Sequence, residues 1–242
     1  MAHFYLNDEL LAAAVGERIS VSGAEARHAV TVSRLITGES ISVGNGAGLV
    51  VSGTIVSADA GEFVLEVETV EQTPAASPAI WLAQALAKGD RDEYAVQQAT
   101  ELGVDGVIPW AATRSIVKWE GNKVAKGHQR WSAIVREATK QSLRPWIPGV
   151  GDLASTAVLC SLAGEARMIV LDPAAEQSLS ALEPDGRDIV LVVGPEGGIS
   201  DTELSRLAAA GASAWRLGGP VLRTSTAGPA AIAVLNSRLG RW

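Results

Sequence analysis

The stretch Leu191-Val-Val-Gly-Pro-Glu-Gly-Gly-Ile-Ser200 decides the fold of this chain, together with Leu217-Gly-Gly-Pro-Val-Leu-Arg-Thr-Ser-Thr226, which follows one short unit later. The apolar run Ile189–Val193 is typical of a strand that is buried on both faces. Four Gly or Pro residues among the next five predict a tight turn whose backbone a ligand can approach closely. A strand, a glycine-rich turn and a helix form the layout of a ligand site at the carboxyl end of a sheet.

Both stretches are expected to lead through a turn into a helix. Ser200 and Glu203 have the spacing of a capping box, which predicts a helix that runs to about Gly211. In the second stretch, a short strand over residues 214–217 is expected to lead through a turn into a helix from Ala227 onward. We expect the two turns to lie side by side at one edge of the sheet.

The composition indicates a cytoplasmic protein without a membrane span. With 242 residues and 47% apolar content, the chain has room for one large domain or two modest ones. Cys160 is the only cysteine, which excludes an internal disulfide and fits a reducing compartment. No apolar run approaches the length of a bilayer span, and the first residues lack the apolar core of a signal peptide.

Charge is distributed unevenly, although the chain as a whole carries a net charge of −7. Residues 1–73 hold three basic and ten acidic side chains, residues 74–150 hold ten and seven, and residues 151–242 hold seven and ten. The middle block therefore carries +3 between two acidic blocks of −7 and −3. A basic block in an acidic chain indicates a local surface for phosphate groups.

The basic side chains of the middle block gather within residues 114–146 and are interleaved with Trp119, Trp131 and Trp146. They are Arg114, Lys118, Lys123, Lys126, Arg130, Arg136, Lys140 and Arg144. This pattern is typical of a surface that contacts RNA phosphates and bases. A solvated helix face with tryptophans in the core has the same pattern.

Residues 1–73 differ in pattern from the rest of the chain. Three β-like runs separated by glycine-containing turns predict a small barrel or meander. They cover residues 40–43, 49–58 and 62–71. Ser22 and Glu25 have capping-box spacing and predict a short helix through about Ser33. The segment 73–78 contains two prolines and is the best linker, so we place a domain boundary there.

From residue 79 onward, strand-like and helix-like segments alternate, which predicts an α/β domain with a parallel sheet. Besides the strands before the glycine turns, the expected strands are residues 79–87, 104–110, 115–119 and 168–171. Besides the helices after those turns, the expected helices are residues 90–102, 122–142 and 156–162. We therefore expect two domains, residues 1–73 and residues 79–242.

The glycine turns exclude several familiar kinds of site. They lack the Gly-Lys-Ser/Thr of a P-loop and the Gly-x-Gly-x-x-Gly of a dinucleotide turn, so neither ATP nor NAD is indicated. The chain has no Gly-x-Ser-x-Gly, so no hydrolase triad is indicated. His3, His28 and His128 are too scattered for a metal cluster, and we expect no metal site.

Arg223 follows the second turn and has more than one interpretation. An arginine there can clamp a phosphate or a base carbonyl with two parallel hydrogen bonds. It can equally cap a helix or pair with Glu196. The hydroxyl residues 224–226 are natural N-cap candidates, and Pro229 fits only in the first turn of the helix that follows.

Taken together, the two turns resemble one family. Gly194-Pro-Glu-Gly-Gly198, followed about two dozen residues later by Leu217-Gly-Gly-Pro-Val-Leu-Arg-Thr-Ser-Thr-Ala227, is similar to the SPOUT methyltransferases of the RsmE type. These enzymes methylate N3 of a uridine in 16S ribosomal RNA, in the decoding region of the small subunit.

Other parts of the chain match the same family in order. Gln84-Ala-Leu-Ala-Lys88 and Gln98-Ala-Thr-Glu-Leu-Gly103 resemble the start of its catalytic domain. Residues 130–148 resemble its central helix, while Phe4-Tyr5 and the segment 28–34 fit its first domain. The resemblance therefore spans almost the whole chain.

The resemblance implies a fold and a set of partners. Residues 1–73 would form a PUA-like β-barrel that binds RNA, and residues 79–242 would form a SPOUT domain whose last turns make a deep trefoil knot. The methyl donor would be S-adenosylmethionine, bound bent in the knot. Family members are homodimers with the donor pocket near the partner subunit, and their substrate is 16S rRNA of the small ribosomal subunit.

The resemblance also implies the residues of the site. The donor would contact Leu171, Asp172, Gly194, Pro195, Glu196, Gly197, Gly198, Leu217, Gly218, Val221, Leu222 and Arg223. Catalysis would depend on Arg223, which positions the base or stabilises its charge, with Glu196 as a candidate proton acceptor. RNA would contact Arg114, Lys118, Arg136, Lys140 and Arg144.

The chain departs from the family pattern at two positions, and two alternatives remain. Ser225 stands where the family commonly has Glu, and His3 stands where it has Arg before the aromatic pair. One alternative is a SPOUT enzyme that methylates a ribose 2′-hydroxyl. The other is an RNA-binding ribosome-assembly factor that has lost catalysis.

Overall fold

The structure is a computed structural model that describes residues 3–59 and 61–242, and it divides into two compact units. The first unit comprises Met1–Ala75 together with Thr139–Ile147. The second unit comprises Ala76–Ala138 and Pro148–Trp242. Nothing in the sequence pattern indicated that residues 139–147 group with the amino-terminal residues.

The first unit is built on a five-stranded mixed sheet in the order β1-β3-β4-β5-β2. Its strands are β1 (Phe4–Leu6), β2 (Arg18–Ser22), β3 (Ser40–Gly44), β4 (Leu49–Asp59) and β5 (Glu62–Gln72). β1 pairs with β3 in parallel, and the other pairs are antiparallel. The three predicted β-runs are confirmed as β3, β4 and β5, while β1 and β2 were not predicted.

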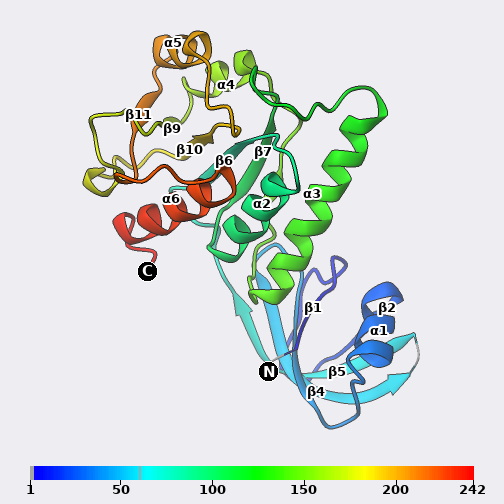
Figure 1. Cartoon of the computed structure of the whole chain (residues 1–242). Helices are drawn as coiled ribbons and strands as arrows, with labels where there is room; N and C mark the ends of the chain where they lie inside the picture. The colour runs from blue at the N-terminus through cyan, green and yellow to red at the C-terminus, as the bar shows by residue number, and fades with distance from the viewer. Residues whose placement is uncertain (1–2, 60) are drawn as a thin grey trace. The chain divides into compact units, whose positions relative to one another are not determined.

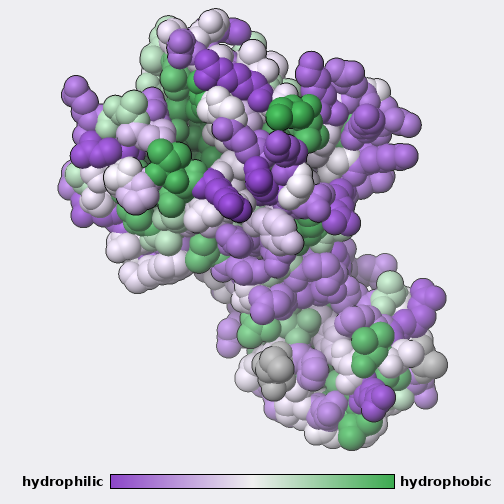
Figure 2. All heavy atoms as spheres, in the orientation of Figure 1, coloured by the Kyte–Doolittle hydropathy of each residue, from purple (hydrophilic) through white to green (hydrophobic). Residues whose placement is uncertain are grey.

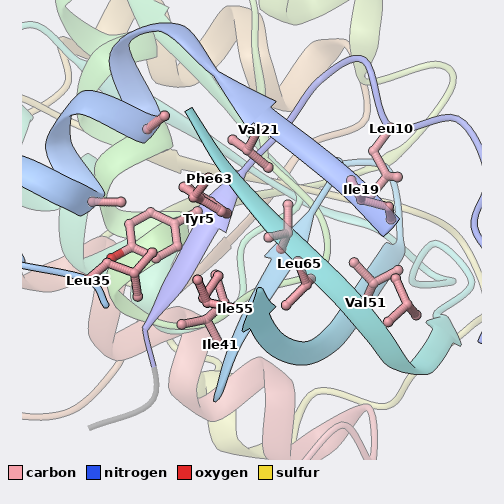
Figure 3. Packing of buried hydrophobic residues seen from close by; sticks show 14 of the residues in the cluster. Tyr5, Leu10, Ile19, Val21, Leu35, Ile41, Val51, Ile55, Phe63 and Leu65 are labelled. Carbon is pink, nitrogen blue, oxygen red and sulfur yellow. The ribbon is translucent and has the colours of Figure 1, made fainter. Parts of the chain in front are cut away.

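Alternate side chains of these strands point into one apolar core. Ile41, Val51, Ile55, Phe63 and Leu65 are all buried there, and Figure 3 shows them with Tyr5 against the curled sheet. The outward positions of the same strands are exposed or half-buried, as the two-residue period of a strand requires. The short amino-terminal unit therefore has a hydrophobic core of its own.

The capping box predicted at Ser22 is wrong. Ser22 is the last residue of β2 and makes no side-chain cap bond, and Gly23 after it takes a φ of +78°. Helix α1 (Gly23–Arg27) continues into a π-helical segment, His28–Val32, so the predicted helix exists but is irregular. The carboxylate of Glu25 is used instead by Lys140, whose Nζ lies 3.2 Å from it.

The second unit is built on a six-stranded parallel sheet in the order β11-β9-β10-β6-β7-β8. Its strands are β6 (Ile80–Ala85), β7 (Gly106–Trp110), β8 (Gly149–Val150), β9 (Arg167–Leu171), β10 (Ile189–Val193) and β11 (Ser213–Trp215). The expected α/β class with a parallel sheet is confirmed.

Helices cover both faces of this sheet (Figure 1). α2 (Arg91–Glu101) and α6 (Thr224–Arg238) pack together on one face, and α4 (Thr156–Leu162) and α5 (Asp201–Ala209) pack on the other. All five residues of β10 are buried, as expected for an apolar strand between two helical layers. The long helix α3 (Asn122–Gln141) and a single turn of 3-10 helix, Leu179–Ala181, complete the elements.

Two predictions for this unit are wrong. Residues 115–119 form no strand, because β8 occupies the sheet edge beside β7 and Trp119 packs onto Gly127 of α3 instead. Helix α6 begins at Thr224 and not at Ala227, which places Pro229 beyond the first turn. Within residues 3–59 and 61–242, no helix is long and apolar enough to span a membrane.

Candidate functional site

A cavity of about 510 Å³ lies at the carboxyl ends of β9, β10 and β11 in the second unit. Its volume falls within the range of about 300–1,000 Å³ that is common for small-molecule sites. Three loops line it: the one after β9, the glycine turn after β10 and the second glycine stretch after β11. Figure 2 shows apolar surface recessed between polar rims in the region where Figure 1 labels β9, β10 and α5.

The cavity brings together eleven of the twelve residues expected to contact the donor. They are Leu171, Asp172, Gly194, Pro195, Glu196, Gly198, Leu217, Gly218, Val221, Leu222 and Arg223. Gly197 does not line the cavity, because its carbonyl faces Arg114. The two glycine turns do meet as expected, although their strands are separated by β9.

The first glycine turn is held by the side chain of Glu196. Its Oε1 accepts hydrogen bonds from the Arg91 Nη1 at 2.9 Å and from the Lys88 backbone amide at 3.2 Å. Burial raises the pKa of Glu196, but hydrogen bonds from backbone amides and from Arg91 outweigh it and leave this pKa below its ordinary value. The turn is thereby fixed to the start of α2 by a carboxylate that stays ionised.

Two further anchors hold the same turn. Arg114 Nη1 donates to the carbonyls of Gly197 at 3.2 Å and Ile199 at 3.3 Å. The predicted capping box is confirmed: Ser200 Oγ accepts from the Glu203 amide, and the Glu203 carboxylate accepts from the Ser200 amide. Glu203 Oε1 also accepts from the Thr113 amide at 2.8 Å, so the loop after β7 is fixed to the start of α5.

The second glycine stretch is held far less tightly. A Cβ built at Gly218 or Gly219 would meet no atom within 4 Å, and Val221 is 76% exposed. Arg223 is exposed and lines the cavity, and no hydrogen bond or ion pair of its side chain is found within the described residues. A cation without an internal partner at the rim of a cavity is available to a ligand.

The cavity also contains residues that the sequence analysis missed. Arg91, Trp215 and Thr224 line it, and Gln84 lies directly behind Thr224. Gln84 had a signal in the sequence, because it is a polar residue in an otherwise apolar strand, and Thr224 was considered only as a helix-cap candidate. Arg91 and Trp215 reach the site only through the packing of α2 and β11.

The residues expected to contact RNA are differently placed. Arg114 is exposed but holds the first glycine turn, and Lys118 is exposed. Arg136 is half-buried on α3 in the second unit, whereas Lys140 and Arg144 belong to the first unit, where Lys140 pairs with Glu25. Three of the five side chains therefore belong to the second unit and two to the first.

The tryptophans of the basic segment pack against the protein and are not exposed as a surface for RNA bases. Trp131 is 1% exposed, and Trp119 packs edge-on against it at a centroid distance of 5.5 Å. In the first unit, Trp146 Nε1 donates to the carbonyl of Thr73 at 2.9 Å. The structure thus favours the simpler interpretation of these three residues, a role in packing.

Among residues 3–59 and 61–242, no group of three or more His, Cys, Asp or Glu side chains is arranged to hold a metal ion.

Comparison with known proteins identifies the family. Residues 75–236 match the RNA methyltransferase domain family. The ribosomal RNA small subunit methyltransferase E of Mycobacterium bovis is 38% identical over 228 residues, which cover 92% of this chain and 87% of that protein. The protein of the same name from Bacillus subtilis is 31% identical over 218 residues, covering 86% of this chain and 85% of its own.

A solved structure agrees with the sequence relatives. The ribosomal RNA small subunit methyltransferase E of Neisseria gonorrhoeae, bound to S-adenosyl methionine, superposes with a TM-score of 0.87 at 28% identity. The match covers 98% of each chain. The chain therefore belongs to the ribosomal RNA small subunit methyltransferase E family, as the two glycine turns predicted.

Proposed function

We propose that this protein transfers the methyl group of S-adenosylmethionine to N3 of a uridine in 16S rRNA of the small ribosomal subunit. The observation that carries the proposal is the three-loop cavity with Arg223 exposed at its rim. Membership of the family and the ligand of the N. gonorrhoeae relative support the donor. An rRNA substrate places the enzyme in the cytoplasm.

The residues of the cavity fit S-adenosylmethionine. Leu171, Trp215 and Leu217 offer apolar walls, and the backbone of the three loops offers amides and carbonyls to an adenine edge. Asp172 and Glu196 provide negative charge for a cationic ligand. When bound, S-adenosylmethionine supplies an electrophilic methyl group on a positively charged sulfur.

Arg223 is the residue that we assign to the base. Uracil N3 is an imide nitrogen and becomes a good nucleophile only when its proton is lost, which leaves negative charge on the uracil oxygens. A guanidinium placed at those oxygens stabilises that charge, and holding N3 in line with the methyl group contributes further, on the order of 7–11 kcal/mol at best. The base must be unpaired or flipped out of its stack to reach the cavity.

Glu196 is better suited to hold the site than to accept the proton of N3. Its carboxylate already accepts bonds from Arg91 and Lys88, and its lowered pKa means a lower affinity for a proton. We therefore assign Glu196 to positioning of the first glycine turn.

Three finer features of the family are part of the proposal. Residues 1–73, which hold the mixed sheet of the first unit, would serve as a PUA-like RNA-binding domain. The loops around the cavity would form a trefoil knot within residues 79–242, and two chains would form a homodimer. Their support is membership of the family, together with the convergence of the three loops on one cavity.

For the RNA, we propose a contact surface at the start of α3. Lys118, Lys123 and Lys126 are exposed in the second unit, and none of them has a recorded ion pair within the described residues. Polar surface covers this half of α3 in Figure 2. Because phosphate contacts release counterions, RNA affinity should fall steeply as salt is raised, and replacing the three lysines by Gln should reduce the salt dependence.

The test is mass spectrometry of nucleosides from 16S rRNA. A strain that lacks this protein should lose one N3-methyluridine, and a plasmid copy should restore it. Appearance of a ribose-methylated nucleoside instead would support the 2′-O-methyltransferase alternative. No change in the rRNA, with no S-adenosylmethionine binding by calorimetry, would support an assembly factor without catalysis.

A further inference from the structure

A buried glutamine stands in an apolar position behind the cavity. In β6, Ile80, Leu82 and Gln84 alternate toward the face that α6 covers, while Ala83 and Ala85 belong to the core on the opposite face. Gln84 is completely buried. An amide is expensive to bury unless its hydrogen bonds are made, so its contacts show what it does.

The amide of Gln84 begins a short chain of hydrogen bonds. Its Nε2 donates to the carbonyl of the adjacent Ala85 at 3.0 Å and to Thr224 Oγ1 at 2.8 Å. Thr224 Oγ1 in turn donates to the carbonyl of Gly194 at 2.7 Å. Thr224 is the first residue of α6, and Gly194 is the first residue of the glycine turn after β10. One threonine hydroxyl thus joins β6, the first glycine turn and the start of α6.

The backbone is shaped to bring these groups together. A Cβ at Gly228 of α6 would lie 3.1 Å from Leu82 Cδ1 and 3.2 Å from Leu82 Cδ2. Because glycine lacks that atom, the first turns of α6 can approach β6 closely enough for Thr224 to reach Gln84. The register agrees, since Gln84 pairs with Val193, which precedes Gly194.

The other end of the amide has no recorded partner. Gln84 Oε1 is buried and accepts no hydrogen bond from the described residues. An aliphatic side chain of similar size would fill the position without that defect. Stability alone therefore does not explain why a glutamine occupies this position. Its hydrogen bond to Thr224 does explain it.

We propose that Gln84 and Thr224 are positioning residues that set the direction of Arg223 at the rim of the cavity. Arg223 immediately precedes Thr224 and is the N-cap of α6, and its carbonyl accepts from the amides of Thr226 at 2.8 Å and Ala227 at 2.9 Å. Fixing Thr224 to Gln84 and Gly194 fixes the first turn of α6 and the residue before it. This inference rests on the proposed role of Arg223 in methyl transfer.

The test compares three threonine variants. Thr224→Val keeps the shape but removes the hydroxyl, Thr224→Ser keeps the hydroxyl, and Thr202→Val makes the same change at an exposed position in the first turn of α5. We expect kcat to fall about 10- to 100-fold in Thr224→Val, because misplacement of a reacting group by about 1 Å costs rates of this order. Thr224→Ser and Thr202→Val should stay within about threefold.

A second readout does not depend on methyl transfer. In the protein without ligand, Thr224→Val should speed hydrogen exchange at the amides of Thr226 and Ala227, which bond to Arg223, and Thr202→Val should not. The Kd for S-adenosylmethionine should change less than kcat. A purely structural role predicts instead a lower melting temperature and unchanged kcat in the folded fraction.

Gln84→Leu tests the other end of the chain of bonds. It should lower kcat, as Thr224→Val does, while leaving the melting temperature within about 3 °C of wild type. The kcat of the double variant should be no lower than that of the less active single variant. Unchanged kcat and unchanged hydrogen exchange in Gln84→Leu and Thr224→Val would overturn the inference. Absence of methyl transfer by the wild-type protein would instead overturn the proposed function.

Discussion

The two glycine turns have similar sequences, but the protein holds the first turn with more hydrogen bonds than the second. The first, residues 194–198, is fixed by Glu196 to Arg91, by Arg114 through two carbonyls, and by the Ser200–Glu203 capping box. The second, residues 217–223, makes few such bonds and exposes Val221 and Arg223.

This difference in hydrogen bonding indicates that the two turns have different roles in the same cavity. A turn whose polar groups are already bound to protein is preorganised, so little entropy is lost when a small ligand enters. A turn with free glycines and an exposed arginine can adjust and can meet a second, larger ligand. We therefore propose that the first turn offers the donor a preformed wall, and that the second turn contacts the donor and, through Arg223, also meets the RNA base.

The largest expected effect on activity comes from Arg223 in the second glycine turn. Arg223→Ala should lower kcat for methyl transfer at least about 10²- to 10³-fold, as for loss of a group that stabilises transition-state charge. Calorimetry should find S-adenosylmethionine affinity within about threefold of wild type. Arg206→Ala, an exposed arginine on α5, is the matched control. Full activity in Arg223→Ala would remove this residue from the mechanism.

The next largest effect, on stability, comes from Glu203, which holds the end of the first glycine turn. Glu203→Ala removes the capping box and leaves the Thr113 amide without its acceptor, so the free energy of unfolding should fall by about 2–3 kcal/mol. Denaturant melts measure this loss. Asp201→Ala, at an exposed position in the same turn of the helix, should cost less than about 1 kcal/mol.

The same carboxylate predicts a pH dependence. Burial raises the pKa of Glu203, but hydrogen bonds from Ser200 and Thr113 outweigh it and leave the folded pKa below the ordinary value of 4.5. Its stabilisation is therefore complete above pH 4.5 and is lost as the pH falls through the folded pKa. Glu203→Gln should be less stable than wild type at neutral pH, and the gap should narrow below pH 4.5; a constant gap contradicts this assignment.

A glycine from each turn gives a direct comparison of their rigidity. Gly198 has a φ of +72°, so Gly198→Ala should destabilise the protein by about 1–2 kcal/mol. Gly218 has no positive φ, and a Cβ there meets nothing within 4 Å, so Gly218→Ala should change stability by less than about 0.5 kcal/mol. Thermal melts of the two variants without ligand measure this. Equal losses of stability in both variants would contradict the proposed difference in rigidity between the turns.

The smallest expected effect comes from the ion pair behind the first turn. Arg91→Met breaks a half-exposed pair with Glu196 and should weaken S-adenosylmethionine binding about two- to fivefold, in line with about 0.5–1 kcal/mol for such pairs. Arg130→Met breaks the comparable pair with Glu93 on the same α2, away from the cavity. Equal affinity in both variants would show that the Glu196 pair does not position the turn.

The sequence predicted what depends on neighbouring residues. The apolar run of β10, the Ser200–Glu203 cap and the stop of α2 at Gly103, with its φ of +95°, are local features, and the structure has them. The strand predicted over residues 115–119 was wrong, because β8 pairs with β7 at that edge of the sheet. The predicted start of α6 was also wrong, because the Arg223 carbonyl already accepts from the amides of Thr226 and Ala227.

The sequence by itself determined the parallel α/β class, because turns, caps and buried strands are encoded by short patterns, and its resemblance to a known family implied the residues of three loops. Only the tertiary structure decided that β9 lies between the strands of the two glycine turns, and that residues 139–147 pack with the amino-terminal unit. It also brought Arg91, Trp215 and Gln84 to the cavity or behind it. Contacts between residues more than a hundred positions apart, such as the 2.8 Å bond from Gln84 to Thr224, leave no periodic signal in the chain and arise only when helices close on a sheet.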